Sequence, residues 1–220
     1  MKKLAMLLLV SLLVGLAFAA EEGYIPASLK SAFEIQLQDN NGMEVRFQLP
    51  QYQIVAQESN GQIFHRIELP GSGTLMKSGL PELPVITTTF AIPYQGGVEI
   101  EVIDSQQSIL TDYNAYPLQQ GAELESPKAF VRNAEYYSSG GQYPAAAIEY
   151  SDPMILRDFR VVTVQVNPFS YNPVTQELTV HSDIRMRLNY NSGPSMNELP
   201  APLQQVSASF DKTYSSLIQN

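Results

Sequence analysis

The two histidines are the first residues to consider for chemistry, because histidine is a common catalytic base and metal ligand at neutral pH. His65 shares an alternating face with aliphatic residues, which is typical of a core or sheet-edge histidine. The run His181-Ser182-Asp183 contains the residue types of a hydrolytic triad. Neighbours on a strand point to opposite faces, however, so Ser182 cannot lie beneath His181 on the polar face of its predicted strand. Two distant histidines also exclude an HExxH zinc site.

Carboxylates and cysteines add no stronger case for catalysis. Asp152 and Asp158 could in principle form the acid pair of a glycoside hydrolase, but their positions are more typical of solvated residues at strand ends. The absence of cysteine excludes disulfides, thiolate zinc sites and a cysteine nucleophile. There is also no glycine-rich phosphate loop and no calcium loop. The sequence therefore predicts a protein that is not an enzyme and holds neither metal nor cofactor.

The charge balance narrows the choice of partners. The 220 residues include 13 Lys and Arg against 22 Asp and Glu, giving a formal net charge of −9. Such an acidic chain disfavours nucleic acid and anionic membrane surfaces as partners. Hydrophobic residues make up 44% of the chain, which indicates a globular protein with a sizeable core rather than a disordered one.

The N-terminus has the pattern of a signal peptide over residues 1–19. Lys2 and Lys3 precede an apolar run, and Ala17-Phe18-Ala19 supplies the small-x-small pattern of a cleavage site. A membrane anchor is the alternative, but the run is at the short end for spanning a bilayer. We expect cleavage and export from a bacterium, to the periplasm, cell surface or medium, with no membrane contact afterwards.

Alternating polar and apolar residues predict strands through most of the remaining chain. Residues 33–37 and 43–47 flank Asn41-Gly42, and residues 52–56 and 63–69 flank Asn60-Gly61, so two hairpins are expected. A short strand at 98–102 and long strands at 156–166 and 178–188 follow.

Helical periodicity is confined to the C-terminus, where Phe210, Tyr214, Leu217 and Ile218 share one helix face. The sequence therefore predicts an all-β protein: an antiparallel, jelly-roll-like β-sandwich over residues 20–190, with a linker and a short C-terminal helix over 191–220.

Two segments carry a more distinctive pattern. The first is Gly79-Leu80-Pro81-Glu82-Leu83-Pro84, followed by Phe90-Ala91-Ile92-Pro93; its prolines favour extended backbone. The second runs from Tyr150-Ser151-Asp152-Pro153 through Leu156–Val162 to Asn167–Pro173 and Leu178-Thr179-Val180. Taken alone, Gly79, Pro81, Leu83 and Pro84 are more typical of the start of a structural strand than of a binding site.

Together, in this order, the two segments resemble the N-terminal propeptide of gingipain-type cysteine peptidases, over roughly residues 42–220. A complete member of that family would continue into a catalytic domain with a Cys–His dyad. Because this sequence has no cysteine, we expect it to be a free-standing propeptide-like protein or the front part of a precursor.

The resemblance implies a β-sandwich that keeps a gingipain-like catalytic domain latent and assists its folding, in trans or within a longer precursor. It further implies a loop that places a basic side chain in the specificity pocket of the peptidase. The corresponding region is 121–144, whose only basic residues are Lys128 and Arg132. Arg132, or failing that Lys128, is the predicted pocket-filling cation; the alternative is that both are solvated loop residues.

Two other classes of function stay open at this point. A secreted carbohydrate-binding or adhesive module would have the same fold, since β-sandwiches host both functions. The 12 tyrosines could form aromatic platforms for sugars, although tryptophan is absent. An independent enzyme is the least favoured class, because no catalytic constellation is recognisable.

Overall fold

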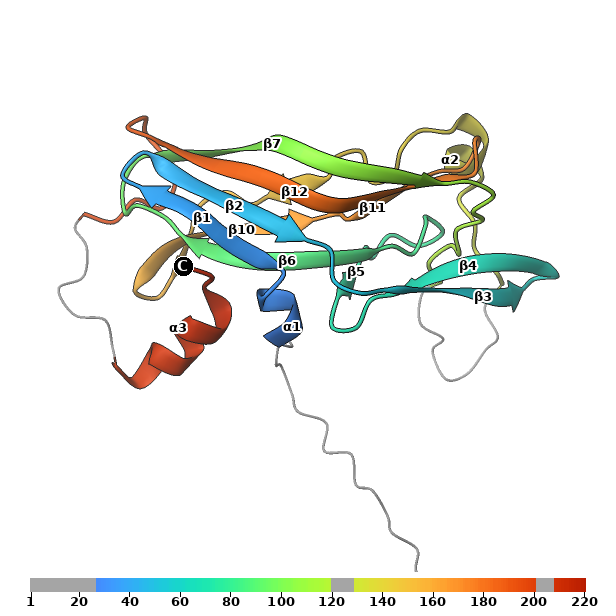
Figure 1. Cartoon of the computed structure of the whole chain (residues 1–220), viewed down its shortest axis with the longest axis horizontal. Helices are drawn as coiled ribbons and strands as arrows, with labels where there is room; N and C mark the ends of the chain where they lie inside the picture. Colours follow the sequence, from blue (N-terminus) through green and yellow to red (C-terminus); the bar gives the residue numbers. More distant parts are fainter. Residues whose placement is uncertain (1–26, 120–128, 201–207) are drawn as a thin grey trace, which may run out of the picture.

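The computed structural model describes residues 27–119, 129–200 and 208–220, whose strands form two five-stranded sheets and a separate hairpin (Figure 1). The first sheet has the order β1-β2-β12-β11, and β7 pairs with the opposite edge of β12. Its strands are β1 (Phe33–Asp39), β2 (Gly42–Gln48), β7 (Gly97–Leu110), β11 (Phe169–Asn172) and β12 (Glu177–Asn191).

The second sheet has the order β5-β6-β10-β8, with β9 also paired to β10. Its strands are β5 (Gly73–Thr74), β6 (Pro84–Ala91), β8 (Ile148–Tyr150), β9 (Met154–Leu156) and β10 (Phe159–Val166). The hairpin consists of β3 (Gln53–Ser59) and β4 (Gln62–Glu68). All pairs between these strands are antiparallel, which confirms the predicted fold class.

The helical elements are short and lie around the sheets. They are α1 (Ala27–Lys30), α2 (Ala134–Ser139), the 3-10 turn η1 (Ala208–Phe210) and α3 (Asp211–Leu217). In Figure 1, α3 and the C-terminus lie at one end of the long axis, while α2 and the β3–β4 hairpin lie at the other. In the described residues, no helix is both long and apolar enough to cross a bilayer.

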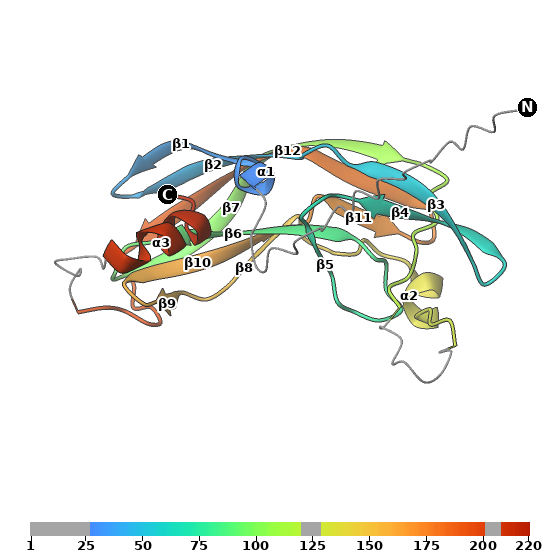
Figure 2. The same cartoon turned by 90° about the horizontal axis from the view of Figure 1, so that it is seen from below.

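The core lies between the two sheets, which form separate layers in Figure 2. The apolar residues that alternate along one face of β12 all lie in this core: Leu178, Val180, Ile184, Met186 and Leu188. The opposing strand β10 contributes Val162, Val164 and Val166, none of which is exposed. Burial of these aliphatic side chains, each worth about 1.5–3 kcal/mol, is the main stabilising contribution in a chain without disulfides.

The first hairpin forms as its Asn-Gly turn predicts. The carboxylate of Asp39 accepts hydrogen bonds from the backbone N–H of Asn41 at 2.7 Å and of Gly42 at 3.0 Å. Gly42 also lies against β12, where a Cβ atom would fall 2.2 Å from the carbonyl oxygen of Leu188. Glycine is therefore required at this position by the close approach of two strands.

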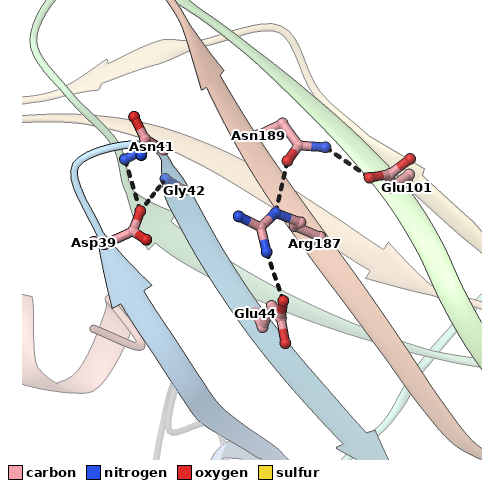
Figure 3. A network of polar contacts seen from close by, with 7 residues as sticks. All are labelled: Asp39, Asn41, Gly42, Glu44, Glu101, Arg187 and Asn189. Carbon is pink, nitrogen blue, oxygen red and sulfur yellow. Dashed lines mark hydrogen bonds and ion pairs between the residues drawn. The ribbon is translucent and has the colours of Figure 1, made fainter.

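The outer face of the first sheet carries paired charges (Figure 3). Arg187 donates to Glu44 at 2.5 Å and to the side chain of Asn189 at 2.8 Å, and Asn189 donates to Glu101 at 2.8 Å. Because these groups are partly exposed, the ion pair contributes at most about 1 kcal/mol. The main effect of these polar side chains is to keep this face of the sheet solvated.

Two strands differ from their predicted lengths. The apolar stretch 156–166 is divided by a turn, because Arg157 has a φ of +53° and separates β9 from β10. The strand predicted at 98–102 extends instead over the whole of β7, whose polar second half pairs with β12 as far as Leu110. Backbone pairing with a long partner overrides weak local strand preference there.

The segment that follows β12 is attached to the sandwich at several points. Arg160, which is 2% exposed, donates to the carbonyl oxygens of Pro93 and Gly96, both at 2.8 Å, and to that of Met196 at 2.8 Å. The carboxylate of Glu198 accepts from the N–H of Gly96 at 3.0 Å. Residues 193–199 of the predicted linker are thus held against the start of β10.

The predicted C-terminal helix is present as α3 and packs on the second sheet. Tyr214 and Ile218 form a small apolar cluster with Val161, apart from the main core. Ile218 also forms a parallel bridge with Thr89, and the N–H of Gln219 donates to the Thr89 carbonyl at 2.8 Å. The last residues therefore extend the second sheet beside β6.

Candidate functional site

The segment from Gly79 to Pro84 leads into β6, whose first residue is Pro84. Pro81 and Leu83 are buried, and Pro81 forms an antiparallel bridge with Pro117. The N–H of Glu82 donates to the carbonyl of Tyr116 at 2.8 Å. The segment is thus an irregular strand whose neighbour, residues 115–118, leads into the region predicted to carry the inhibitory loop.

Gly79 joins two segments of the chain, one just before the predicted region 121–144 and one within it. Its N–H donates to the carbonyl of Leu118 at 2.8 Å, and its carbonyl accepts from the N–H of Asn133 at 3.0 Å. Its φ is +76°, and a Cβ atom would lie 3.0 Å from the Asn133 nitrogen and 3.2 Å from Cγ1 of Val131. A positive φ and a close backbone approach both require glycine here. We call Leu118–Gln119 and Val131–Asn133 the two stems.

Gln119 forms a second connection between the stems. Its side-chain amide donates to the Val131 carbonyl at 2.8 Å, and its side-chain oxygen accepts from the Val131 N–H at 2.8 Å. The same amide donates to the carbonyl of Pro117 at 2.8 Å. Sequence reasoning missed Gln119, since an isolated glutamine in an irregular segment carries no local signal of its long-range partner.

Arg132 lies in the second stem, just before α2. Its guanidinium carbon lies 4.0 Å from the ring centroid of Tyr137, a cation–π contact. Burial raises the pKa of Tyr137, and Arg132 partly opposes that shift. Asn133 begins α2, because its side chain accepts from the N–H of Tyr136 at 2.9 Å. Lys128, the other predicted cation, lies outside the described residues.

Aromatic side chains support both stems from the side of the β3–β4 hairpin. The ring of Phe64, which is 1% exposed, lies 5.7 Å from that of Tyr116 and 5.4 Å from that of Phe130. Arg66 lies over Tyr116 at 5.3 Å and forms an ion pair with Glu82 at 2.5 Å. These contacts connect the hairpin, the Gly79–Pro84 segment and the stems into one unit.

The two histidines have structural partners. Nδ1 of His65 accepts from the N–H of Asn114 at 3.1 Å, as expected for a satisfied histidine at a sheet edge. Nδ1 of His181 lies 2.9 Å from Oγ of Ser105, and His181 is only 7% exposed. The alternation indicated a solvated position for His181, but the register shifts between His181 and Asp183, so strict alternation ends there. Its burial lowers its pKa.

The carboxylates considered for catalysis also have ordinary surroundings. Asp158 accepts a hydrogen bond from the hydroxyl of Tyr214 and lies 3.9 Å from Nε of Arg157, while Asp152 is exposed. Within residues 27–119, 129–200 and 208–220, no group of three or more His, Cys, Asp or Glu residues could hold a metal ion. Among the described residues, the arrangement at the stems offers no nucleophile activated by a base.

The chain is similar to known proteins over most of its length. The sequence profile of the family described as Propeptide_C25 matches residues 28–218. Gingipain R2 of Porphyromonas gingivalis is 25% identical over 216 residues, which cover 96% of this chain and 28% of the relative. Lys-gingipain of the same species is 22% identical over 155 residues, 67% of this chain and 9% of the relative. The chain thus spans about a quarter or less of the length of these relatives.

Two solved structures share the fold. One is the complex of the pro- and mature domains of RgpB from P. gingivalis, with a TM-score of 0.74 and 20% identity over 86% of this chain and 97% of that chain. The other concerns the zymogenic latency of gingipain K from P. gingivalis, with a TM-score of 0.62 and 18% identity over 73% of this chain and 93% of that chain.

Proposed function

Because the chain belongs to the Propeptide_C25 family, we propose that it is a prodomain that keeps a gingipain-like cysteine peptidase latent and assists its folding. The chain has no cysteine and therefore cannot supply the nucleophile of such a peptidase. Its partner is the catalytic domain, encoded either separately or in a longer precursor. The likeness to pro-domains described with a mature domain and with zymogenic latency supports this role.

The observation that carries the proposal is the double connection between the stems. Gly79 bonds to Leu118 and Asn133, and Gln119 bonds to Val131, so the two stems are held side by side at one fixed place. A rigid sandwich that holds Arg132 beside this place loses little conformational entropy on binding, which favours occupation of an extended cleft.

Lys128 and Arg132 are the two candidates for the cation that enters the specificity pocket. A cation in such a pocket would form a charge-assisted hydrogen bond with an acidic group of the peptidase. Arg132 would have to leave the ring of Tyr137, losing a contact worth about 0.5–1 kcal/mol at an exposed site. Lys128 lies between the stems in sequence and is tested beside Arg132.

Residues 1–19 are proposed to direct export from a bacterial cell and to be removed. The relatives are proteins of the bacterium P. gingivalis. N-terminal sequencing of the exported protein tests the cleavage, with a mature start at Ala20 expected and an intact Met1 contradicting it.

The experiment that tests the function mixes residues 20–220 with the mature domains of RgpB and of gingipain K. Slow or blocked hydrolysis of a peptide substrate and a complex on gel filtration are expected. Lys128→Ala and Arg132→Ala are then compared. Loss of potency in one variant identifies the pocket cation, and unchanged potency in both excludes the pocket role of either residue. The absence of both inhibition and complex formation with either peptidase would refute the proposed function.

A further inference from the structure

We propose that Gln119 is a positioning residue for inhibition, one that fixes the backbone beside Arg132 without touching the peptidase. This inference rests on the proposed function and deepens it. It concerns three backbone groups that the Gln119 side chain holds: the carbonyl of Pro117 and the N–H and carbonyl of Val131. The side-chain amide pairs with Val131 as a residue of a neighbouring antiparallel strand would.

The two stems are joined at two places. Gly79 bonds to Leu118 and Asn133, and Gln119 bonds to Val131. Because the bonds of Gly79 remain when Gln119 is replaced, the effect of Gln119 lies in fixing the backbone of the residues beside it.

Val131 is the residue whose backbone becomes fixed. Both of its polar backbone groups bond to Gln119, and the next residue but one, Asn133, bonds to Gly79. Arg132 is thus held on both sides, and the direction in which the chain leaves the second stem is set before any partner binds. Ordering the backbone of one residue lowers a binding constant by a factor of about five to thirty. Because this backbone is already ordered in the free protein, binding to the peptidase does not incur that loss.

The fold offers a matched control in Gln142. Like Gln119, it forms three side-chain hydrogen bonds; its amide donates to the carbonyl and hydroxyl of Ser170 at 3.4 and 2.8 Å and to the hydroxyl of Thr179 at 2.8 Å. Both acceptors lie on strands of the first sheet, β11 and β12, and not on the stems. Replacing Gln142 removes the same type of contact without changing the connection between the stems.

The test compares Gln119→Ala, Gln119→Met and Gln142→Ala with the unaltered chain. Inhibition constants are measured against the mature domains of RgpB and gingipain K, together with urea unfolding and amide hydrogen exchange at Val131. Methionine preserves the shape of glutamine and removes its hydrogen bonds. Both Gln119 variants are expected to inhibit about tenfold or more weakly and to exchange the Val131 amide faster, with unfolding midpoints similar to that of Gln142→Ala.

The outcomes separate this inference from the function on which it rests. If the unaltered chain inhibits and Gln119→Met inhibits equally well, the positioning role is wrong while the proposed function stands. The same holds if Gln142→Ala loses as much potency as Gln119→Ala, since the loss would then follow general destabilisation. If the unaltered chain inhibits neither peptidase, both proposals are refuted.

Discussion

Gly79→Ala is the most informative single substitution, because the structure gives each contribution to its cost. The φ of +76° costs an alanine about 1–2 kcal/mol in the left-handed region. The new Cβ atom would also lie 3.0 Å from the backbone nitrogen of Asn133 and 3.4 Å from the carbonyl carbon of Arg132, so the second stem must shift. Crowding of this kind costs about another 1–2 kcal/mol, giving about 2–4 kcal/mol in all.

Gly61→Ala is the matched control for that substitution. Gly61 has a similar φ of +71° in the turn between β3 and β4, but a Cβ atom there would meet nothing within 4 Å. It should therefore lose only the left-handed cost, about 1–2 kcal/mol. The difference between the two variants isolates the close approach of Gly79 to the second stem.

Urea unfolding at neutral pH measures both variants on one scale, with the slope against urea expected to stay unchanged. Inhibition of a mature gingipain-like peptidase provides the second measurement, in which Gly79→Ala should be about tenfold or more weaker and Gly61→Ala unchanged. Equal losses of stability in the two variants, together with full potency of Gly79→Ala, would refute the argument that Gly79 holds the stems.

Three further predictions concern other parts of the chain. Burial lowers the pKa of His181 below the unfolded value of about 6.5, so below that pH the unfolded chain binds more protons than the folded one. The free energy of unfolding should therefore fall as the pH decreases below that value. Urea unfolding of His181→Gln should show a weaker fall over the same pH range. Arg160→Met leaves several backbone carbonyls without a donor and should lower the free energy of unfolding by about 3 kcal/mol. Amide hydrogen exchange over residues 193–199 should become faster, and unchanged slow exchange there would contradict the role of Arg160. Met76 is 82% exposed and lies three residues before Gly79, so we expect it to contact a bound peptidase. Met76→Glu should therefore inhibit about tenfold more weakly. Met196 is 59% exposed and lies beside the start of β10, and the control variant Met196→Glu should inhibit normally.

Much of the fold could be predicted from local sequence because one face of each sheet is buried. The alternation in β12 assigned Leu178, Ile184 and Leu188 to the core, where all three are found. The Asn-Gly pair likewise located the turn between β1 and β2. Prediction was weaker where pairing with a distant strand decides the structure, as in the long β7, or where a positive φ interrupts an apolar run, as at Arg157.

The candidate site shows the same division. The segments at 79–93 and 150–180, taken together and in order, indicated the family, and the family profile confirmed it. The sequence could not indicate that Gly79 bonds to both stems, because Leu118 and Asn133 are far from it along the chain. Nor could it identify Gln119 or the contact between Arg132 and Tyr137, since such pairs depend on how separate segments meet.

The sequence by itself determined the β class, the set of apolar residues that β12 buries, the family, and the absence of a cysteine nucleophile in these residues. Those properties follow from residue type and from a period of two, which act over a few neighbouring residues. Only the tertiary structure decided that Gly79 and Gln119 join the two stems and that Ile218 and Gln219 extend the second sheet. Such contacts depend on backbone groups brought together by the whole fold, and any residue type carries those groups.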